Sequence, residues 1–295
     1  MLPRRFNLHR PRSLSEVFGL LDQYGDDASV YAGGTELLIA LKARVLHYPH
    51  LIDLKALSEL AAIEEYDGDV VIGALASHHR IATHPLVRGV VPAYADLSDG
   101  IANIRVRCAG TLGGNLCFAE PHADPPAMLA ALGARVRLHS KEGQRDCAVA
   151  DFILGDFETA RQPGEVMTAI LIPKPAPELK AAYRCYGAGE RPAAGAAVAI
   201  LPDAAGNVAA AQFWIGAVSG QPAALTATMA AAGGKPLGEL AEACLAVAAD
   251  EIAAIAASDD SHGSADYKRH LALTMLERAL AAALGGEARA ERMRA

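Results

Sequence analysis

Two glycine pairs constrain what this chain can fold into more than any other feature of its sequence. The first lies in YAGGTELL, residues 31–38, and the second in AGTLGGNLC, residues 109–117. Glycine adopts positive φ readily and carries no Cβ, so such a segment can turn several backbone N–H groups toward one point. Either each pair is a plain tight turn, or the two pairs hold one bound anion from opposite sides.

The residues around the glycine pairs favour the bound anion. Thr35 and Thr111 supply hydroxyl groups, and Asn115 supplies an amide. Few basic residues lie inside the two segments, so backbone N–H groups would carry the binding, with help from the macrodipole where a helix follows. Asp124, on the segment leading out of the second pair, is placed to accept a hydrogen bond from a sugar or ribityl hydroxyl.

The common phosphate-binding motifs are missing from the sequence. It contains neither G-x-x-x-x-G-K-[ST] nor a G-x-G-x-x-G that opens a helix after a strand. The glycines of GAGERPAAG, residues 187–195, have the wrong spacing for the second motif. The sequence therefore disfavours a P-loop NTPase and a Rossmann domain.

Strands mixed with helices along the whole chain predict an α+β architecture. A helix is expected over 13–25, with Ser13 as its N-cap and Gly25 as its C-cap. A second is expected over 35–45, with Thr35 as its N-cap. Asp67-Gly68 predicts a hairpin turn, and Pro92 interrupts a helical segment. The second glycine pair is expected in a loop. The other expected elements include a strand from Ala134, strands within 181–187, 195–201 and 208–218, and helices at 237–257 and 264–284.

Composition excludes several classes of protein. The formal net charge of −7 argues against a nucleic-acid partner, and no apolar run is long enough for a membrane span. The basic N-terminus lacks a following apolar region, so we expect no signal peptide and a cytoplasmic location. The cysteines form no C-x-x-C pair and predict free thiols, with no iron–sulfur cluster in this chain. Cysteine occupies positions 108, 117, 147, 185 and 244.

No arrangement of residues stands out as a catalytic or metal-binding constellation. His78, His79 and His84 have no nearby carboxylate or cysteine pattern that would complete a metal site, so we interpret them as structural or surface residues. Glu120 and His122, which follow the second glycine pair, are interpreted in the same way. We therefore expect no catalytic residue and no metal ligand in this chain.

Read together, the two glycine segments resemble a known pair of signatures. YAGGTELLIALK and IRVRCAGTLGGNLCFAEPHADPPAMLAALGA are similar to the flavin-binding signatures of the FAD-binding medium subunits of molybdenum hydroxylases, the carbon monoxide dehydrogenase and xanthine dehydrogenase family. VIGALAS, FWIGAVSGQP and SADYKRHLALTMLERAL fall in the family's order. The resemblance implies a two-part FAD-binding domain of the vanillyl-alcohol-oxidase (PCMH) type and a C-terminal α/β domain. The implied boundaries are 1–174 for the first domain, with subdomains of about 1–56 and 57–174, then 178–285 for the second and 286–295 for a tail.

The resemblance also implies how one FAD would bind. The two glycine segments would wrap its pyrophosphate from two sides, and Asp124 would hydrogen-bond the ribityl or ribose hydroxyls. Tyr183 or Tyr186 would lie near the isoalloxazine. The implied FAD-binding residues are Ala32, Gly33, Gly34, Thr35, Glu36, Leu37, Thr111, Leu112, Gly113, Gly114, Asn115 and Asp124.

In this family the flavin subunit is one part of a larger complex. The resemblance implies a small subunit with two [2Fe-2S] clusters and a large subunit with the molybdenum cofactor, assembled as a dimer of heterotrimers. Electrons would pass from the clusters through FAD to an external acceptor. The insertion that would bring a [4Fe-4S] cluster is absent. Cys108 stands where the family usually has Asn, and Cys185 where a basic residue is frequent, so the acceptor stays unassigned, as does the substrate.

Two other functions remain open at the level of sequence. One is a self-sufficient FAD-dependent oxidase or dehydrogenase of a small molecule, although the residues after 174 are few for a full-size substrate domain. The other is a non-enzymatic binding or scaffold module, in which both glycine pairs are only turns.

Overall fold

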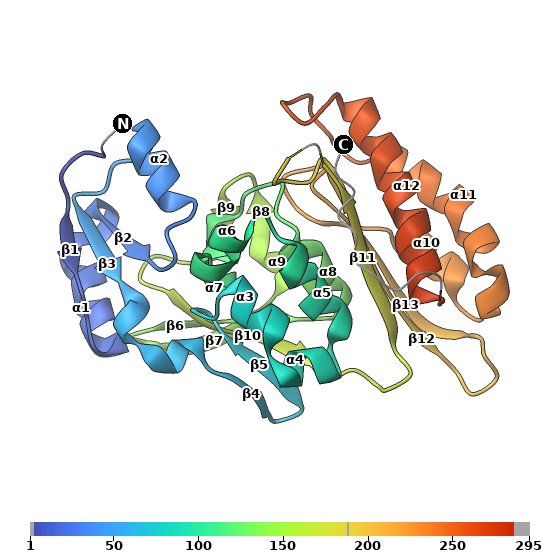
Figure 1. Cartoon of the computed structure of the whole chain (residues 1–295), viewed down its shortest axis with the longest axis horizontal. Coiled ribbons are helices and arrows are strands. Elements are labelled where there is room, and N and C mark those ends of the chain that lie inside the picture. Colours follow the sequence, from blue (N-terminus) through green and yellow to red (C-terminus); the bar gives the residue numbers. More distant parts are fainter. Residues whose placement is uncertain (1–2, 188, 286–295) are drawn as a thin grey trace.

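A computed structural model describes residues 3–187 and 189–285 of the chain. Its elements form three units along the long axis, built on a three-stranded, a five-stranded and a four-stranded sheet (Figure 1). This is the α+β class with a two-part first domain and a C-terminal domain, as predicted. The tail expected over 286–295 lies outside the described residues.

The N-terminal unit is a small parallel sheet in the order β1-β3-β2, with helices in the connections. The predicted caps of its first helix are confirmed. Ser13 Oγ accepts a hydrogen bond from the Glu16 N–H at 3.2 Å, and Gly25 ends the helix with a φ of +47°. The elements are β1 (Asn7–His9), α1 (Leu14–Tyr24), β2 (Ala28–Tyr31), α2 (Leu37–Ala43) and β3 (His50–Asp53).

The start of α2 differs from the prediction, and Thr35 as its N-cap is wrong. The Leu38 N–H donates to the Gly34 carbonyl at 3.1 Å, so Thr35 and Glu36 form a turn before the helix. Glu36 takes the N-cap position without a side-chain cap. The Thr35 hydroxyl instead faces the second glycine segment, 3.2 Å from where a Cβ on Gly110 would stand.

The central unit is an antiparallel sheet in the order β4-β5-β10-β6-β7. Asp67 and Gly68 both have positive φ, as the predicted two-residue hairpin requires. Pro92 begins a new helix, so the predicted interruption is confirmed. The strands are β4 (Ile63–Tyr66), β5 (Asp69–Gly73), β6 (Arg135–Ser140), β7 (Gly143–Ala148), β8 (Ile153–Gly155), β9 (Glu158–Thr159) and β10 (Val166–Pro173). The helices are α3 (His78–Thr83), α4 (Pro85–Val90), α5 (Pro92–Gly100), α6 (Ile104–Ala109), α7 (Leu112–Phe118), α8 (Pro125–Ala131) and α9 (Val149–Phe152).

The second glycine pair is not in a loop, which corrects the prediction. Gly113 and Gly114 lie in the first turn of α7, whose N-cap is Thr111. The Thr111 hydroxyl accepts a hydrogen bond from the Gly114 N–H at 3.2 Å. Leu112 is fully buried, and its burial adds to the cap in fixing where this helix begins.

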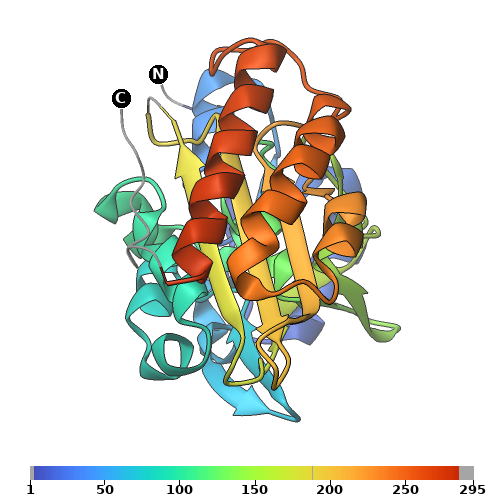
Figure 2. The ribbon, with the colours of Figure 1, turned by 90° about the vertical axis from the view of Figure 1, so that its right-hand side faces the viewer.

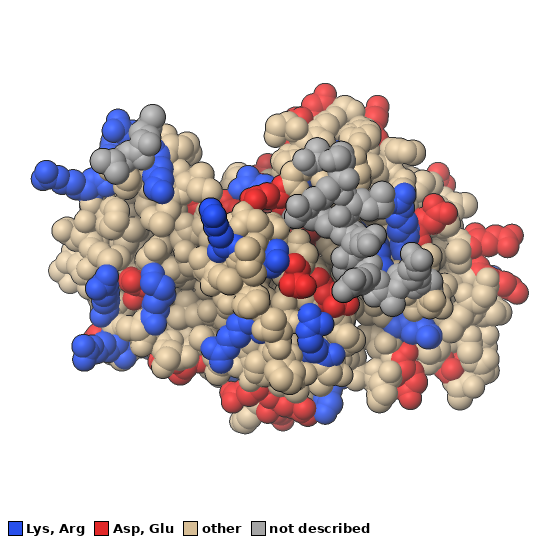
Figure 3. Space-filling model, viewed as in Figure 1, with Lys and Arg blue, Asp and Glu red and all other residues tan. Residues whose placement is uncertain are grey.

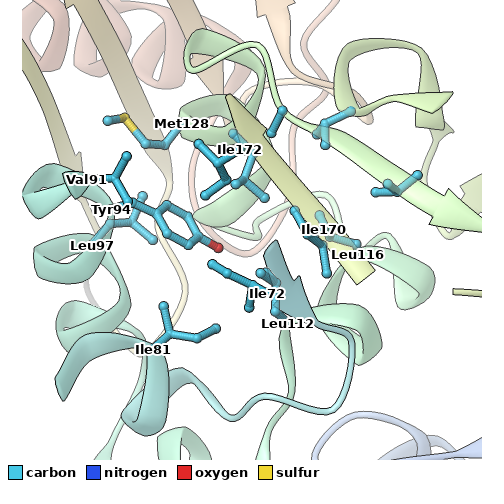
Figure 4. Close-up of a cluster of buried hydrophobic side chains, with 14 of the residues drawn as sticks. Ile72, Ile81, Val91, Tyr94, Leu97, Leu112, Leu116, Met128, Ile170 and Ile172 are labelled. Atoms are coloured by element: carbon cyan, nitrogen blue, oxygen red, sulfur yellow. The ribbon is translucent and has the colours of Figure 1, made fainter. Parts of the chain in front are cut away.

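Helices and strands of the central unit enclose one apolar core (Figure 4). The ring of Tyr94, from α5, lies among Val91 and Leu97 on the helix side and Ile72 and Ile172 on the strand side. Tyr94 is completely buried, and burial raises the pKa of its hydroxyl. The core therefore ties the helices that carry the second glycine segment to the central sheet.

The C-terminal domain is an antiparallel sheet in the order β11-β12-β13-β14, with its long helices on one face (Figure 2). Its other face packs on α5 and α8 of the central unit. Both long helices were predicted, but the short α10 was not. The elements are β11 (Lys180–Tyr186), β12 (Ala194–Pro202), β13 (Val208–Gly216), β14 (Ala223–Ala224), α10 (Thr226–Ala232), α11 (Leu240–Ala253) and α12 (Ala265–Ala283).

The central core predicts which apolar truncation destabilises the chain. Ile72→Ala removes a completely buried side chain from β5 and should lower the free energy of unfolding by about 2–5 kcal/mol. Leu154→Ala is the control, because Leu154 is 49% exposed and its loss should change stability by no more than about 0.5 kcal/mol. Urea unfolding of both variants measures the difference. Equal losses would contradict the assignment of the core.

Candidate functional site

The two glycine segments, far apart in the sequence, touch each other through their backbones. A Cβ on Gly33 would overlap the carbonyl of Ala109 and would stand 3.0 Å from the Cα of Gly110. Only glycine at position 33 allows this approach. The loop that follows β2 is therefore packed directly on the junction between α6 and α7.

A segment after β5 supports the second glycine segment. The N–H groups of Leu112 and Gly113 donate to the carbonyls of Ala76 and Ala74, at 3.0 and 2.9 Å. A Cβ on Gly113 would stand 2.8 Å from that Ala74 carbonyl oxygen. Leu112 and Gly113 thus use their N–H groups inside the chain, and they position the segment rather than offer donors to a ligand.

The first segment, in contrast, offers a row of backbone donors. In residues 3–187 and 189–285, no acceptor receives a hydrogen bond from the backbone N–H groups of 33–37. Gly34 has a φ of +73°, and its Cβ would stand too close to the Tyr31 ring, so this turn also requires glycine. Consecutive N–H groups in such a turn form a concave site for an anion.

Asn115, in the second glycine segment, adds a buried polar atom without a partner. Its Oδ1 is buried and has no hydrogen-bond partner among the described residues. A buried amide oxygen without a partner costs free energy, so its retention indicates a group supplied by a ligand or water. The free donors and the glycine contact fit the phosphates of a cofactor, and the Asn115 oxygen is an acceptor for a hydroxyl or N–H group of the same ligand.

Asp124 lies where the central unit meets the C-terminal domain. Its carboxylate accepts a hydrogen bond from the Tyr183 hydroxyl at 3.1 Å, and both side chains are buried. Tyr183 is on β11. The two residues that the resemblance linked to FAD, Asp124 and Tyr183, are therefore in direct contact with each other. Tyr186, at the end of the same strand, packs instead against the core of the C-terminal domain.

Sequence reasoning missed a cluster of charges that joins the glycine segments to the C-terminal domain. Arg191 Nη2 lies 2.6 Å from Glu36 Oε2, and Arg191 Nε lies 3.7 Å from Glu120 Oε2. Burial raises the pKa of Glu120, and the charge of Arg191 opposes that rise. In the sequence, Glu190 and Arg191 are neighbours in a glycine-rich segment. That pattern does not indicate that the partners of Arg191 lie as far away in the sequence as Glu36.

His122 makes a second contact between the domains. Its Nδ1 lies 2.9 Å from the Pro192 carbonyl oxygen, and its Nε2 lies 3.1 Å from Asp260 Oδ2. Burial lowers the pKa of His122. Burial alone would raise the pKa of Asp260, but the hydrogen bond from buried Lys268, at 2.6 Å, holds it down at about 2. His122 therefore links the central unit to the C-terminal domain through both ring nitrogens.

His78 packs against Gly110 of the second glycine segment. Its N–H donates to the Gly110 carbonyl at 3.1 Å, and its side chain is 2% exposed. Burial, and then the charge of Arg107, lowers the pKa of His78 to about 4. The imidazole is therefore neutral at physiological pH.

The two departures from the family pattern lie in different surroundings. Cys108 is exposed on α6, and Cys185 is buried on β11. Within the described ranges, no three His, Cys, Asp or Glu side chains gather in a way that could hold a metal ion.

Charges are unevenly spread over the surface. On the face shown in Figure 3, Lys and Arg side chains lie over both the N-terminal and the central units, and Asp and Glu side chains gather at the lower edge of the central unit and over the C-terminal domain. Over the described part of the chain, no helix has the length and apolar character to cross a membrane.

Known families and proteins match both parts of the chain. A model described as the FAD binding domain in molybdopterin dehydrogenase matches 4–175, and one described as the CO dehydrogenase flavoprotein C-terminal domain matches 178–283. The carbon monoxide dehydrogenase medium chain of Afipia carboxidovorans is 34% identical over 287 residues, 95% of this chain and 97% of that protein.

Two solved structures share the fold along nearly the whole chain. Carbon monoxide dehydrogenase from Hydrogenophaga pseudoflava gives a TM-score of 0.91 at 34% identity, covering 96% of this chain and 98% of that one. Quinoline 2-oxidoreductase from Pseudomonas putida 86 gives 0.89 at 30% identity, with the same coverage.

The contact between the glycine segments predicts a steric effect on cofactor binding. Gly33→Ala should force the first segment off Ala109, at a cost of about 1–3 kcal/mol, and weaken FAD binding roughly ten- to a hundredfold. Gly89→Ala is the matched control, since a Cβ there meets open space. Fluorescence titration with FAD measures both. Equal affinities in the two variants would show that the contact does not shape the site.

His78 predicts a pH dependence of stability. In the unfolded chain its pKa is about 6.5, so that state binds the proton more readily than the folded state, where the pKa is about 4. The stability gained from a neutral His78 is complete above about pH 6.5 and is lost as the pH falls toward about 4, by up to about 3 kcal/mol. His78→Gln should flatten this loss in urea unfolding. If the free energy of unfolding falls with pH in the same way in both proteins, other groups cause the loss of stability.

Proposed function

Because this chain belongs to the family of FAD-binding medium subunits of molybdenum hydroxylases, we propose that it is the electron-transfer subunit of a multi-subunit dehydrogenase. Bound FAD supplies the redox chemistry, taking electrons from [2Fe-2S] clusters of a small subunit and passing them to an external acceptor. The protein's own contribution is to bind and orient the flavin and to exclude water from it.

One observation carries the proposal for the site. The backbone contact between Gly33 and Ala109–Gly110 brings the first glycine segment, with its free N–H groups of 33–37, against the second segment, in which the Asn115 oxygen is buried without a partner. In the proposed complex, Ala32 to Leu37 surround the pyrophosphate from one side. Thr111 to Asn115 form the other side, where Leu112 and Gly113 act through position and Asn115 through its side chain.

The sugar chain of FAD is assigned to the neighbouring contact. Asp124 and Tyr183 are buried together at the interface of the two domains, and the hydroxyl of Tyr183 fixes the carboxylate. We propose that Asp124 accepts hydrogen bonds from ribityl or ribose hydroxyls. Tyr183 or Tyr186, both on β11, would lie near the isoalloxazine.

The proposed partners follow from the relatives. One relative is called a medium chain, and related structures are named as Cu,Mo-CO dehydrogenase and as carbon monoxide dehydrogenase lacking the Mo-pyranopterin moiety. We propose a small [2Fe-2S] subunit and a large molybdenum-cofactor subunit, assembled as a dimer of heterotrimers.

A cytoplasmic location agrees with the five cysteines, all of them free. The proposed domain boundaries stay at 1–174 and 178–285.

The spectrum of the purified chain tests cofactor binding. The protein should retain or take up about one FAD per chain and show flavin absorbance, because the site offers donors to the pyrophosphate. Reduction with dithionite should bleach that absorbance. A colourless chain that cannot be reconstituted with FAD would contradict the proposal.

Metal analysis of the native complex tests the subunit role. A tagged chain purified from its own cells should bring molybdenum and about four iron atoms per flavin, two for each [2Fe-2S] cluster. The isolated chain should not bleach with purine, pyridine or aldehyde substrates, because the hydroxylation site lies on another subunit. A monomeric flavoprotein that is reduced directly by a small molecule would support the self-sufficient dehydrogenase instead.

A further inference from the structure

One turn of the C-terminal domain reaches both glycine segments. It spans 190–193, between β11 and β12. Arg191 pairs with Glu36 beside the first segment and with Glu120 beyond the second. Asn103 Nδ2 donates to Glu190 Oε1 at 2.5 Å, at the start of α6. The turn therefore contacts residues at the ends of three different elements around the proposed pyrophosphate site.

The charges around this turn would oppose an anionic ligand if they were left uncompensated. Glu36 and Glu120 flank the segments proposed to hold a pyrophosphate, and Asp124 is near enough to act on the Glu120 carboxyl. Carboxylates beside a bound phosphate repel it, most strongly where burial keeps water out. Another cation near the first segment, Lys55, reaches the Ala32 carbonyl but is already paired with Asp53 at 2.9 Å.

We propose that Arg191 is a positioning residue for FAD, whose guanidinium neutralises Glu36 and Glu120 beside the pyrophosphate and holds the C-terminal domain across both glycine segments. This inference rests on the proposed function. It explains why a fork-shaped cation with several donors stands at this point, since one guanidinium can serve two carboxylates at once.

The first test compares two arginine variants. Arg191→Gln should weaken FAD binding at least about tenfold at low salt, and the deficit should shrink at high salt, where repulsion is screened. Arg191→Lys keeps the charge and should retain most of the affinity. Arg135→Gln is the matched control: Arg135 also lies 2.6 Å from a carboxylate, that of Asp69, and its side chain is also 42% exposed, but it lies on the central sheet.

The second test separates charge compensation from a simple tie between domains. The double variant Glu36→Gln with Arg191→Gln should recover much of the affinity lost in Arg191→Gln, because the neutral amide no longer repels the phosphates. Glu120→Gln alone, which neutralises the other carboxylate that Arg191 contacts, should bind FAD at least as tightly as the wild type, and it serves if the arginine variant does not fold. A structural tie predicts no such recovery and no salt dependence.

The outcomes distinguish this inference from the proposed function. A wild-type chain that takes up no FAD overturns both. A wild-type chain that binds FAD, with Arg191→Gln matching Arg135→Gln, overturns only the role of Arg191. Loss of affinity in Arg191→Gln without recovery in the double variant, or a tenfold loss in Glu120→Gln alone, also overturns charge compensation.

Discussion

The contact between Gly33 and the Ala109–Gly110 backbone is the constraint on which the rest of the structure depends. No side chain separates the two segments at this point. The backbones of the N-terminal unit and of the α6–α7 junction pack so closely that a Cβ on Gly33 has no room. The junction of α6 and α7 is in turn held by the carbonyls of Ala74 and Ala76 and rests on the central core. Backbone donors and a buried amide oxygen are thereby gathered from units that share no sheet.

The C-terminal domain completes this arrangement from a third direction. Tyr183 and Cys185 of its first strand belong to the same apolar cluster as the central core, so the two domains share buried surface. His122 and Arg191 add polar contacts across the same interface. A site whose walls are fixed before a flexible dinucleotide arrives loses less entropy on binding, which favours tight retention of the cofactor.

Local signals in the sequence could predict local structure. Ser13 and Gly25 predicted the ends of α1, and Asp67-Gly68 predicted the hairpin, because each depends on neighbours within a few residues. The loop expected around the second glycine pair was wrong, since hydrogen bonds from distant carbonyls fix the start of α7. The contacts of Arg191 were missed because its partners, Glu36 and Glu120, are also distant in the sequence. The bound-anion interpretation depended on reading both segments together, and the whole-chain resemblance then supplied the flavin and the family.

The separation of the parts along the chain has a consequence for how the protein is made. Glu36 and Arg191 stand 155 residues apart, yet both border the same small volume. At about 5–20 residues per second, translation delivers Arg191 roughly eight to thirty seconds after Glu36. A nascent chain on the ribosome therefore lacks a complete copy of the proposed FAD site until the β11–β12 hairpin has emerged. For the proposed site, flavin loading is therefore a late event in biogenesis.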